Sequence, residues 1–553
     1  MLFLAQVILI SCAGDNAKEE QTLSIFNISF SPSFDEDGNR EYNVWKSTDR
    51  CTFAAAGNSG QTFSSGPLVP GGSSSEFRVM LPSQYAENEI YVTYPGNAGF
   101  TFGEHVNYEI PSVQDGKPEL MMLGMAGTGT PSSARDVTLN PAYGLIVVET
   151  DEGKTPDCIE ISAKGKENIS GHIKADLRSG SFIAEFPYVK MESKGILGSG
   201  SGKKAFMLSP GELSEGIILT VKYTSGETIS EDFPEIREIK QGESIFINAD
   251  GSYQKKPAEL AVCGDNMIYL LRPEESCDFK SAVYWSLDVR TLSDQLGLDK
   301  SRCNHMDECK VVENGSRLLA TSSYGFAFLM DIATRKLIWC SNRCPNAHSA
   351  ELLPNNRVAV ATSSGEDAYN RKVLIYDLSR NHQEIFKYEV RSCHGLVWDS
   401  ANEVLYASGL HETDNSRGAV FSFRLKNWES TSPSLELVNA AYAPAGSKSV
   451  HDICLGGKDK LVAAGTSAWF INTGTGSFSE KITHFSQYSQ IKSLNYNAST
   501  GECWYTCADR RNPVPDKESS TRQICYTANI GNESVNKIIE TPQDIYKVRV
   551  INW

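Results

Sequence analysis

The chain has 553 residues, and its 52 Lys and Arg against 68 Asp and Glu give a formal net charge of −16. No basic cluster offsets this charge, so a phosphate backbone would be repelled and nucleic acid is not an expected partner. The length exceeds what one hydrophobic core serves and predicts about three or four domains, and the abundance of tyrosine, phenylalanine and glycine favours mostly β structure.

The N-terminus starts with about ten apolar residues, which is the length of a signal-peptide core and too short to span a bilayer. The run ends in Ser11 and Cys12, and a small residue directly before cysteine resembles the bacterial lipobox. The resemblance implies that Cys12 becomes the lipidated N-terminus. The acidic residues that follow resemble the surface-export tether of lipoproteins in Gram-negative gut anaerobes.

We therefore expect residues 1–22 to be a lipoprotein signal and tether. The protein would be bacterial and held at the outer membrane or cell surface, with its lipid anchor as the only contact with the membrane. The alternative is a soluble protein with a frayed apolar N-terminus.

From about Leu23 to Ile247 the sequence alternates short apolar strands with Gly, Ser, Pro and Asn, as in β-sandwiches. Within this part, four short pieces stand out: residues 45–49 (WKSTD), 90–95 (IYVTYP), 118–122 (PELMM) and the turn at 208–211 (LSPG). In these pieces the sequence resembles the fimbrillin-like family of surface pilins and adhesins.

The fimbrillin-like resemblance implies two transthyretin-like sandwiches, at residues 23–130 and 131–252. Family members polymerise by strand exchange, but a second large domain follows here, so we expect a cap or stalk. The alternative is a spacer that only lifts the C-terminal domain off the membrane. The polar segment 249–257, which ends in proline, marks the boundary.

Residues 257–553 carry one pattern repeatedly. An apolar strand, a polar turn and a second apolar strand follow His348, His394, His451 and, at the equivalent place, Asp307. A recurrence at roughly 40 to 55 residues is typical of radial repeats. Six blades can be counted, with five or seven as alternatives, and residues 546–553 would supply the inner strand that the first blade lacks, which closes the ring.

This part resembles an uncharacterised bacterial family of six-bladed propellers with His-Ser-x-Glu-Leu-Leu-Pro and His-Gly-x-x-Trp-Asp motifs, which occur here from His348 and His394. The predicted fold is therefore all-β, with a pair of transthyretin-like β-sandwiches followed by a six-bladed β-propeller.

The first strand of each propeller blade lines the central channel, so His348, His394 and His451 should meet at one mouth of it. Three neutral imidazoles that converge beside an acidic group can bind a divalent transition metal, Zn or Mn. The alternative is three channel histidines that hydrogen-bond to water and backbone carbonyls, without metal.

The other blades contribute further candidates. Asp307, Lys492 and Lys547 would complete the ring of mouth residues, and Lys547 and Arg549 on the closing strand are candidates for binding an anionic sugar. Glu351 and Asp452 lie on the same strands as the histidines and either orient them or face solvent.

Two classes of function follow. The first is a lipoprotein whose fimbrillin-like stalk presents a propeller that binds a carbohydrate or an envelope protein at the histidine-lined mouth. The second is a metal-dependent lyase or hydrolase that cleaves acidic oligosaccharides, with a lysine on the substrate carboxylate or a histidine as base. The sequence contains no recognisable acid–base pair, which favours binding, whereas the clustering of titratable groups favours catalysis.

Overall fold

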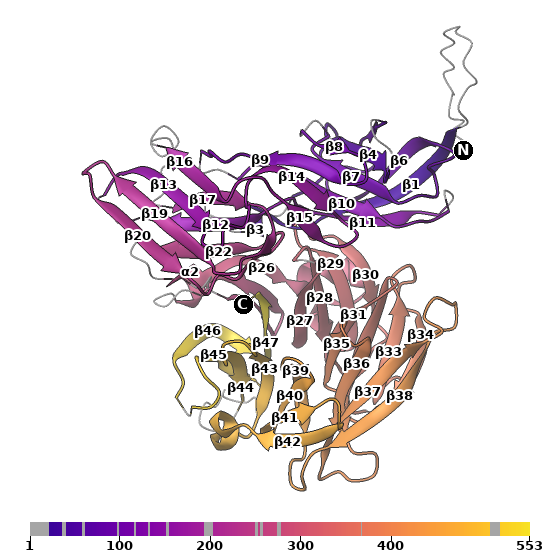
Figure 1. Cartoon of the computed structure of the whole chain (residues 1–553). Helices are drawn as coiled ribbons and strands as arrows, with labels where there is room; N and C mark the ends of the chain where they lie inside the picture. Colours follow the sequence, from indigo (N-terminus) through magenta and orange to yellow (C-terminus); the bar gives the residue numbers. More distant parts are fainter. Residues whose placement is uncertain are drawn as a thin grey trace. The chain divides into compact units, whose positions relative to one another are not determined.

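The computed structural model describes residues 21–552 apart from 36–39, 42, 58–60, 97–98, 116–117, 131–132, 151–153, 193–202, 249–252, 255–257, 274–277, 314, 366–367, 509–519 and 533. The predicted signal and lipidation site at Cys12 and most of the predicted boundary segment 249–257 lie outside the described residues. The chain forms two compact units that divide between Tyr253 and Gln254, and both are built from β-sheets, as predicted (Figure 1).

The first unit begins with a seven-stranded sheet in the order β5-β4-β7-β10-β11-β1-β6. Its strands are β1 (Gln21–Phe30), β4 (Cys51–Ala55), β5 (Phe63–Ser65), β6 (Ser74–Pro82), β7 (Ile90–Tyr94), β10 (Met122–Ala126) and β11 (Arg135–Pro141). The sheet curls until its edge strands β5 and β6 come into contact, and the Ser65 hydroxyl donates a hydrogen bond to the Arg78 carbonyl. The result is a nearly closed barrel around Phe26, Trp45 and Phe77, which are fully or almost fully buried.

Two four-stranded sheets, β17-β12-β22-β23 and β16-β13-β19-β20, follow in the same unit. Their strands are β12 (Gly144–Glu149), β13 (Pro156–Ala163), β16 (Tyr188–Glu192), β17 (Lys203–Leu208), β19 (Ile217–Tyr223), β20 (Thr228–Phe233), β22 (Ser244–Asn248) and β23 (Tyr253–Gln254). One face of β12 packs Ile146 and Val148 into the core between the two sheets. This is the sandwich arrangement that alternating strands predict.

The other face of β12 is covered by a sheet in the order β15-β14-β9-β8. It consists of β8 (Thr101–Phe102), β9 (Val106–Ile110), β14 (Gly171–Asp176) and β15 (Ser181–Ile183), and short pairs join β2 (Ser33–Phe34) to β3 (Arg40–Glu41) and β18 (Gly211–Glu212) to β21 (Glu238–Ile239). Leu145 and Val147 of β12 pack against Tyr108 and Ile173 of this sheet. Because β9 and β14 come from the two predicted sandwiches, their pairing joins the segments that the sequence treats separately.

Within the described residues, the second unit contains six four-stranded antiparallel sheets, each one blade of a propeller. Blades one to three contain β24 (Glu259–Gly264), β25 (Met267–Leu271) and β26 (Val283–Asp288); β27 (Met306–Val312), β28 (Arg317–Ser322), β29 (Phe326–Asp331) and β30 (Leu337–Ser341); β31 (Ala347–Leu353), β32 (Arg357–Thr362), β33 (Lys372–Asp377) and β34 (Glu384–Glu389).

Blades four to six contain β35 (Gly395–Asp399), β36 (Val404–Leu410), β37 (Gly418–Lys426) and β38 (Ser434–Tyr442); β39 (Val450–Leu455), β40 (Lys460–Gly465), β41 (Ala468–Asn472) and β42 (Ser477–Lys481); β43 (Ile491–Tyr496), β44 (Cys503–Cys507), β45 (Thr521–Thr527) and β46 (Lys537–Ile545). Short helices lie between blades or strands, namely α2 (Phe279–Ala282), α3 (Ser293–Leu296) and the 3₁₀ helices η1 (Val289–Leu292), η2 (Lys300–Arg302) and η3 (Thr483–Gln487).

The last strand, β47 (Lys547–Asn552), pairs with β24 at the inner edge of the first blade. The inner strands β27, β31, β35, β39, β43 and β47 contact one another in sequence, and β47 also contacts β27, so the ring is closed (Figure 1). The first blade therefore takes three strands from its own segment and the fourth from the C-terminal one, as the repeat predicts. Because the ring is closed, each inner strand has another inner strand on both sides of it.

Candidate functional site at the mouth of the propeller channel

Four of the six inner strands carry a β-bulge at the same place near their start. The register of strand pairing shifts between residues 306 and 308, 347 and 349, 450 and 452, and 491 and 493. The residues inside these bulges are Asp307, His348, His451 and Lys492. A bulge leaves one residue out of the ladder and redirects its side chain, so one backbone device repeated in four blades positions four of the candidate residues.

His394 directly precedes β35, and Tyr546 directly precedes β47, at the equivalent places of the two remaining blades. In three neighbouring blades, the residue two positions before the one at the mouth has left-handed backbone geometry. These residues are His305, Asn346 and Ser392, with φ of 51°, 52° and 50°. Non-glycine residues adopt this region at a cost and mostly where the surroundings enforce it. We call the six residues Asp307, His348, His394, His451, Lys492 and Tyr546 the mouth ring.

The structure brings the three predicted histidines together. The ring centroids of His348 and His394 are 4.4 Å apart, and those of His394 and His451 are 4.8 Å apart. Asp307 Oδ1 lies 3.2 Å from His348 Nδ1, and its other carboxylate oxygen accepts a 2.6 Å hydrogen bond from the Ser323 amide. The two remaining members lie beside them, with Lys492 Nζ 5.7 Å from the centre of the Tyr546 ring.

Hydrogen bonds orient the middle imidazole of the mouth ring. His394 Nδ1 lies 2.7 Å from the Ser392 carbonyl oxygen and donates to it, and Nε2 lies 3.2 Å from the Ser363 hydroxyl. A carbonyl oxygen can only accept, so Nδ1 carries a proton, and in the neutral imidazole Nε2 then accepts from the hydroxyl. The Nδ1 atom of His451 is buried and makes no hydrogen bond with the described part of the protein.

The surroundings keep two of the imidazoles uncharged. Burial first, and then repulsion from the other histidines and from Lys492 and Lys547, lowers the pKa of both His394 and His451 well below the ordinary histidine value. Burial also lowers the pKa of the Lys492 ammonium to about 8. The mouth ring therefore combines neutral imidazoles with a lysine whose charge the protein itself destabilises.

The sequence predicts Lys547 in the mouth ring, and this prediction is wrong. The structure places Lys547 one residue deeper, and Tyr546 takes the mouth position. The Lys547 ammonium is fully buried and donates hydrogen bonds of 3.1 Å to the backbone carbonyls of His348 and His394. It thereby supports the mouth ring from below.

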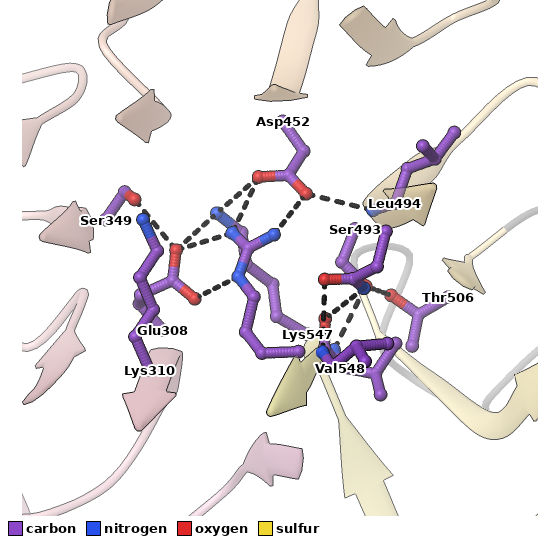
Figure 2. A network of polar contacts seen from close by, with 12 residues as sticks. Glu308, Lys310, Ser349, Asp452, Ser493, Leu494, Thr506, Lys547 and Val548 are labelled. Atoms are coloured by element: carbon purple, nitrogen blue, oxygen red, sulfur yellow. Dashed lines mark hydrogen bonds and ion pairs between the residues drawn. The ribbon is translucent and has the colours of Figure 1, made fainter. Parts of the chain in front are cut away.

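Beneath the mouth, a buried charge network crosses the channel (Figure 2). Arg549 donates to both oxygens of Glu308 and both oxygens of Asp452, at 2.6 to 2.7 Å, and Lys547 lies 3.4 Å from the same two carboxylates. Burial opposes the charge of Arg549, but Asp452 and Glu308 outweigh it and raise the pKa of Arg549 well above its usual range.

This network engages Lys547 and Arg549 with protein groups rather than leaving them for a ligand. The structure also places the two carboxylates that lie on the strands of the histidines. Asp452 belongs to the network, although the sequence marks it as a possible partner of the histidines. Glu351 instead forms an ion pair with Lys310, with 2.7 Å between Lys310 Nζ and the carboxylate. Binding of a ligand by Asp307 and Lys492, which line the mouth, stays a prediction.

Glu308 and Tyr546 are the site residues that the sequence analysis missed. Glu308 directly follows Asp307, as Asp452 follows His451, so the repeat itself carried a signal for the carboxylate pair. Tyr546 carried none, because its residue type differs from the other mouth residues and the register of β47 is needed to place it.

The histidines were also predicted to hold Zn or Mn. Among the described residues, no three His, Cys, Asp or Glu side chains are arranged so that they can hold a metal ion. Metal binding stays a prediction, and the function proposed below does not depend on it. None of the described cysteines forms a disulfide with another described cysteine, and all of them are buried except the half-buried Cys158 and Cys454. No helix in the described part of the chain is both long and apolar enough to cross a bilayer.

Comparison with known proteins finds one family to which part of the propeller is similar. No curated protein matches the chain. The model of a family of unknown function (DUF6528) matches residues 281–500, which contain the second to fifth blades and five of the six mouth-ring residues. The C-terminal part of this chain is therefore similar to that family.

Proposed function

We propose that the propeller is a binding domain that holds an acidic carbohydrate at the mouth ring, with a carboxylate of the sugar on Lys492. The observation that carries this proposal is the state of Lys492. Its side chain is almost completely buried, and its ammonium hydrogen-bonds Gln490 Oε1 at 3.0 Å. No carboxylate in the described part of the chain lies within ion-pair distance of it.

A buried ammonium without a direct counter-ion is costly, which is why burial lowers the pKa of Lys492 to about 8. A ligand carboxylate at the mouth would supply the missing counter-ion and raise this pKa again. The free energy that the folded protein loses by burying the charge would then be partly recovered on binding, so the site favours anions over neutral ligands.

The neutral imidazoles suit the hydroxyl groups of a sugar. Each neutral imidazole has one donor and one acceptor nitrogen, and a hydroxyl group can satisfy either. His451 Nδ1, which makes no hydrogen bond with the described part of the chain, would be the atom for such a contact. His348 remains partly accessible, with 12% of its side chain exposed, beside the carboxylate of Asp307.

The predicted lipid anchor at Cys12 completes the proposal. It would tether the chain to the bacterial outer membrane, with the N-terminal unit as a stalk and the propeller as the part that meets the carbohydrate. This element of the proposal depends on the lipobox resemblance alone.

The test is calorimetric titration of the whole protein with D-galacturonate and with D-galactose, its neutral counterpart. We expect galacturonate to bind and galactose to bind at least about tenfold more weakly, because a charge-assisted hydrogen bond contributes about 1.5–3 kcal/mol. Lys492→Met should remove this preference, whereas the matched substitution Lys458→Met, at an exposed turn, should not.

Equal affinity for the acidic and neutral sugars, or an unchanged preference in Lys492→Met, would contradict the proposal. The sugar is recovered after titration with oligogalacturonate as well. Shortened products in that sample would show that the protein cleaves the sugar and does not only bind it. Binding to an envelope protein without binding to any of these sugars would show that the ligand is a protein and not a carbohydrate.

A further inference from the structure

A polar cavity lies near the mouth ring within the propeller. It has a volume of about 430 Å³, and its walls include Arg302, Tyr324, Arg343 and Asn346. This size is within the range of pockets that hold small ligands. The walls come from the segments that precede β27 and β31, from the turn between β28 and β29, and from the loop between β32 and β33.

The cavity is positively charged within a chain of strong negative charge. Both Arg302 and Arg343 are exposed, and neither forms an ion pair with a carboxylate in the described part of the chain. Arg302 is held in place by a 3.1 Å hydrogen bond from Nη2 to the Tyr324 carbonyl. Two guanidinium groups without carboxylate partners favour a ligand with a planar or tetrahedral anionic group, which they can bind through paired N–H donors.

The cavity also offers an aromatic surface. Tyr324 is 44% exposed, and its ring packs against that of His305, with the centroids 4.3 Å apart. His305 has left-handed backbone geometry, with φ of 51°, so a strained residue backs the tyrosine. A half-exposed aromatic ring supported from behind can stack against the apolar face of a sugar ring.

Two short connections link the cavity to the mouth ring. The amide of Ser323, which also lines the cavity, donates to Asp307 at 2.6 Å, and Asp307 contacts His348. Asn346 precedes His348 by two residues, and its backbone carbonyl accepts from the amide of Ser363, whose hydroxyl contacts His394. The cavity and the mouth ring therefore share one end of the second and third blades.

We propose that the cavity is a second subsite for the same ligand, and that the ligand is an oligosaccharide with repeated acidic groups. One acidic group would lie on Lys492 at the mouth and another on Arg302 and Arg343, with the sugar ring on Tyr324. This inference rests on the proposed function of the mouth ring. The acidic groups are carboxylates or sulfate esters, which share the chemistry that the guanidinium groups recognise.

The test compares ligands by length, using calorimetric titration of the whole protein with galacturonate monomer, its linear trimer and a sulfated trimer of a neutral sugar. We expect at least about tenfold tighter binding of the trimer than of the monomer, because it engages both subsites. The double variant Arg302→Gln/Arg343→Gln should lose this gain and keep the affinity for the monomer. Tyr324→Ala should reduce the affinity for the trimer only.

The matched control is Arg424→Gln, an exposed arginine on β37, which should change neither affinity. Near-ultraviolet circular dichroism checks that each variant is folded. Whichever trimer binds more tightly identifies the anionic group. Tighter binding of adenosine monophosphate than of either trimer would contradict the assignment to a sugar.

The two proposals fail separately. If the monomer binds in a way that depends on Lys492 but the double arginine variant leaves the affinity for the trimer unchanged, the second subsite is refuted and the proposed function stands. If the double variant weakens the trimer but Lys492→Met weakens neither ligand, the mouth ring is not a sugar site, and the two-subsite ligand is refuted with it.

Discussion

The side chains at the channel are arranged in two layers with different electrostatic character. The mouth layer holds neutral imidazoles and a lysine with a lowered pKa. The deeper layer holds Arg549 between Glu308 and Asp452, where the opposite charges are directly paired and buried. The deeper layer thus satisfies its own charges, whereas the mouth layer leaves a cation for a ligand to pair with.

The deeper layer predicts a large effect of Arg549→Met on stability. The substitution would leave two buried carboxylates with Lys547 as their main counter-ion, and removal of one partner from a buried ion pair costs about 3–5 kcal/mol. Urea unfolding of the variant should show a loss of this size.

The control for Arg549→Met is Arg522→Met, because Arg522 is half exposed and pairs with Asp544. Exposed pairs contribute about 0–1 kcal/mol. We also expect Glu308→Gln/Arg549→Met to recover part of the loss, since Asp452 and Lys547 then remain as one pair of opposite charges. Equal effects of Arg549→Met and Arg522→Met would show that the network contributes nothing to stability.

The mouth layer predicts that acid destabilises the protein. The pKa of His451 is lowered in the folded state, so the unfolded chain binds a proton there near pH 6.5 while the folded chain does not. Stability due to this group is present above about pH 6.5 and is lost as the pH falls below it. Between pH 6 and 5, His451→Gln should reduce the slope of unfolding free energy against pH by up to about 1.4 kcal/mol per pH unit.

The matched control is His172→Gln, at an exposed position in the first unit, which should leave the slope as it is. A wild-type protein whose unfolding free energy is constant over this pH range would contradict the lowered pKa.

At the level of elements, the inner strands determine how the channel is built. The bulges in β27, β31, β39 and β43 aim Asp307, His348, His451 and Lys492 at the mouth. The strand β47 adds the two cations of the deeper layer and pairs with β24, whose residues are all buried. One strand therefore closes the ring and supplies both cations of the deeper layer.

Deletion of residues 547–553 should accordingly prevent the propeller from folding cooperatively. It exposes the edge of β24 and removes both cations that balance Glu308 and Asp452. Limited proteolysis should degrade the truncated propeller rapidly. A milder variant, Val548→Asp, places a charge at a fully buried position and should lower the thermal midpoint without removing the strand. A truncated chain with the thermal midpoint of the full chain would refute the role of β47 in closure.

The sequence predicts most of the mouth because its information is periodic. The histidines at 348, 394 and 451 recur at equivalent places of three blades, and closure of the ring brings equivalent positions together regardless of their separation in the chain. The partners of Arg549 could not be predicted, because they depend on which residues face each other across the channel. Lys547 lies one residue deeper in the channel than predicted, because the register of a closing strand is set by its neighbour and not by its own sequence pattern.

The same distinction applies to the first unit. Its strands are evident from their alternation, but the curl that brings β5 to β6 and the pairing of β9 with β14 are contacts between distant segments. Alternation shows that a strand has a buried face and does not show which strand lies beside it. Strand content was therefore predictable, whereas the barrel and the shared sheet were not.

At the scale of the whole molecule, each of the two units has hydrophobic clusters of its own, such as those around Ile159 in the first and Phe421 in the second. We propose that the first unit serves as a stalk and that the lipid anchor at Cys12 attaches it to the membrane. The residues that would bind the ligand all belong to the second unit.

The proposed anchor predicts that Cys12→Ser abolishes lipidation. In a Gram-negative host fed with an alkyne-labelled palmitate, the full-length protein should incorporate the label and sediment with membranes, and the variant should do neither. Cys158→Ser, which removes a half-buried thiol, should behave like the wild type. A label that persists in Cys12→Ser would place the lipid elsewhere or refute the anchor.

The most direct test of the central claim is a crystal structure of the protein with galacturonate trimer bound. We predict one carboxylate of the trimer within hydrogen-bond distance of Lys492 Nζ, about 2.7–3.2 Å, with the imidazoles of His348 and His451 against its hydroxyl groups. A trimer bound away from the mouth ring, or bound there with its carboxylates turned toward solvent, would contradict the account.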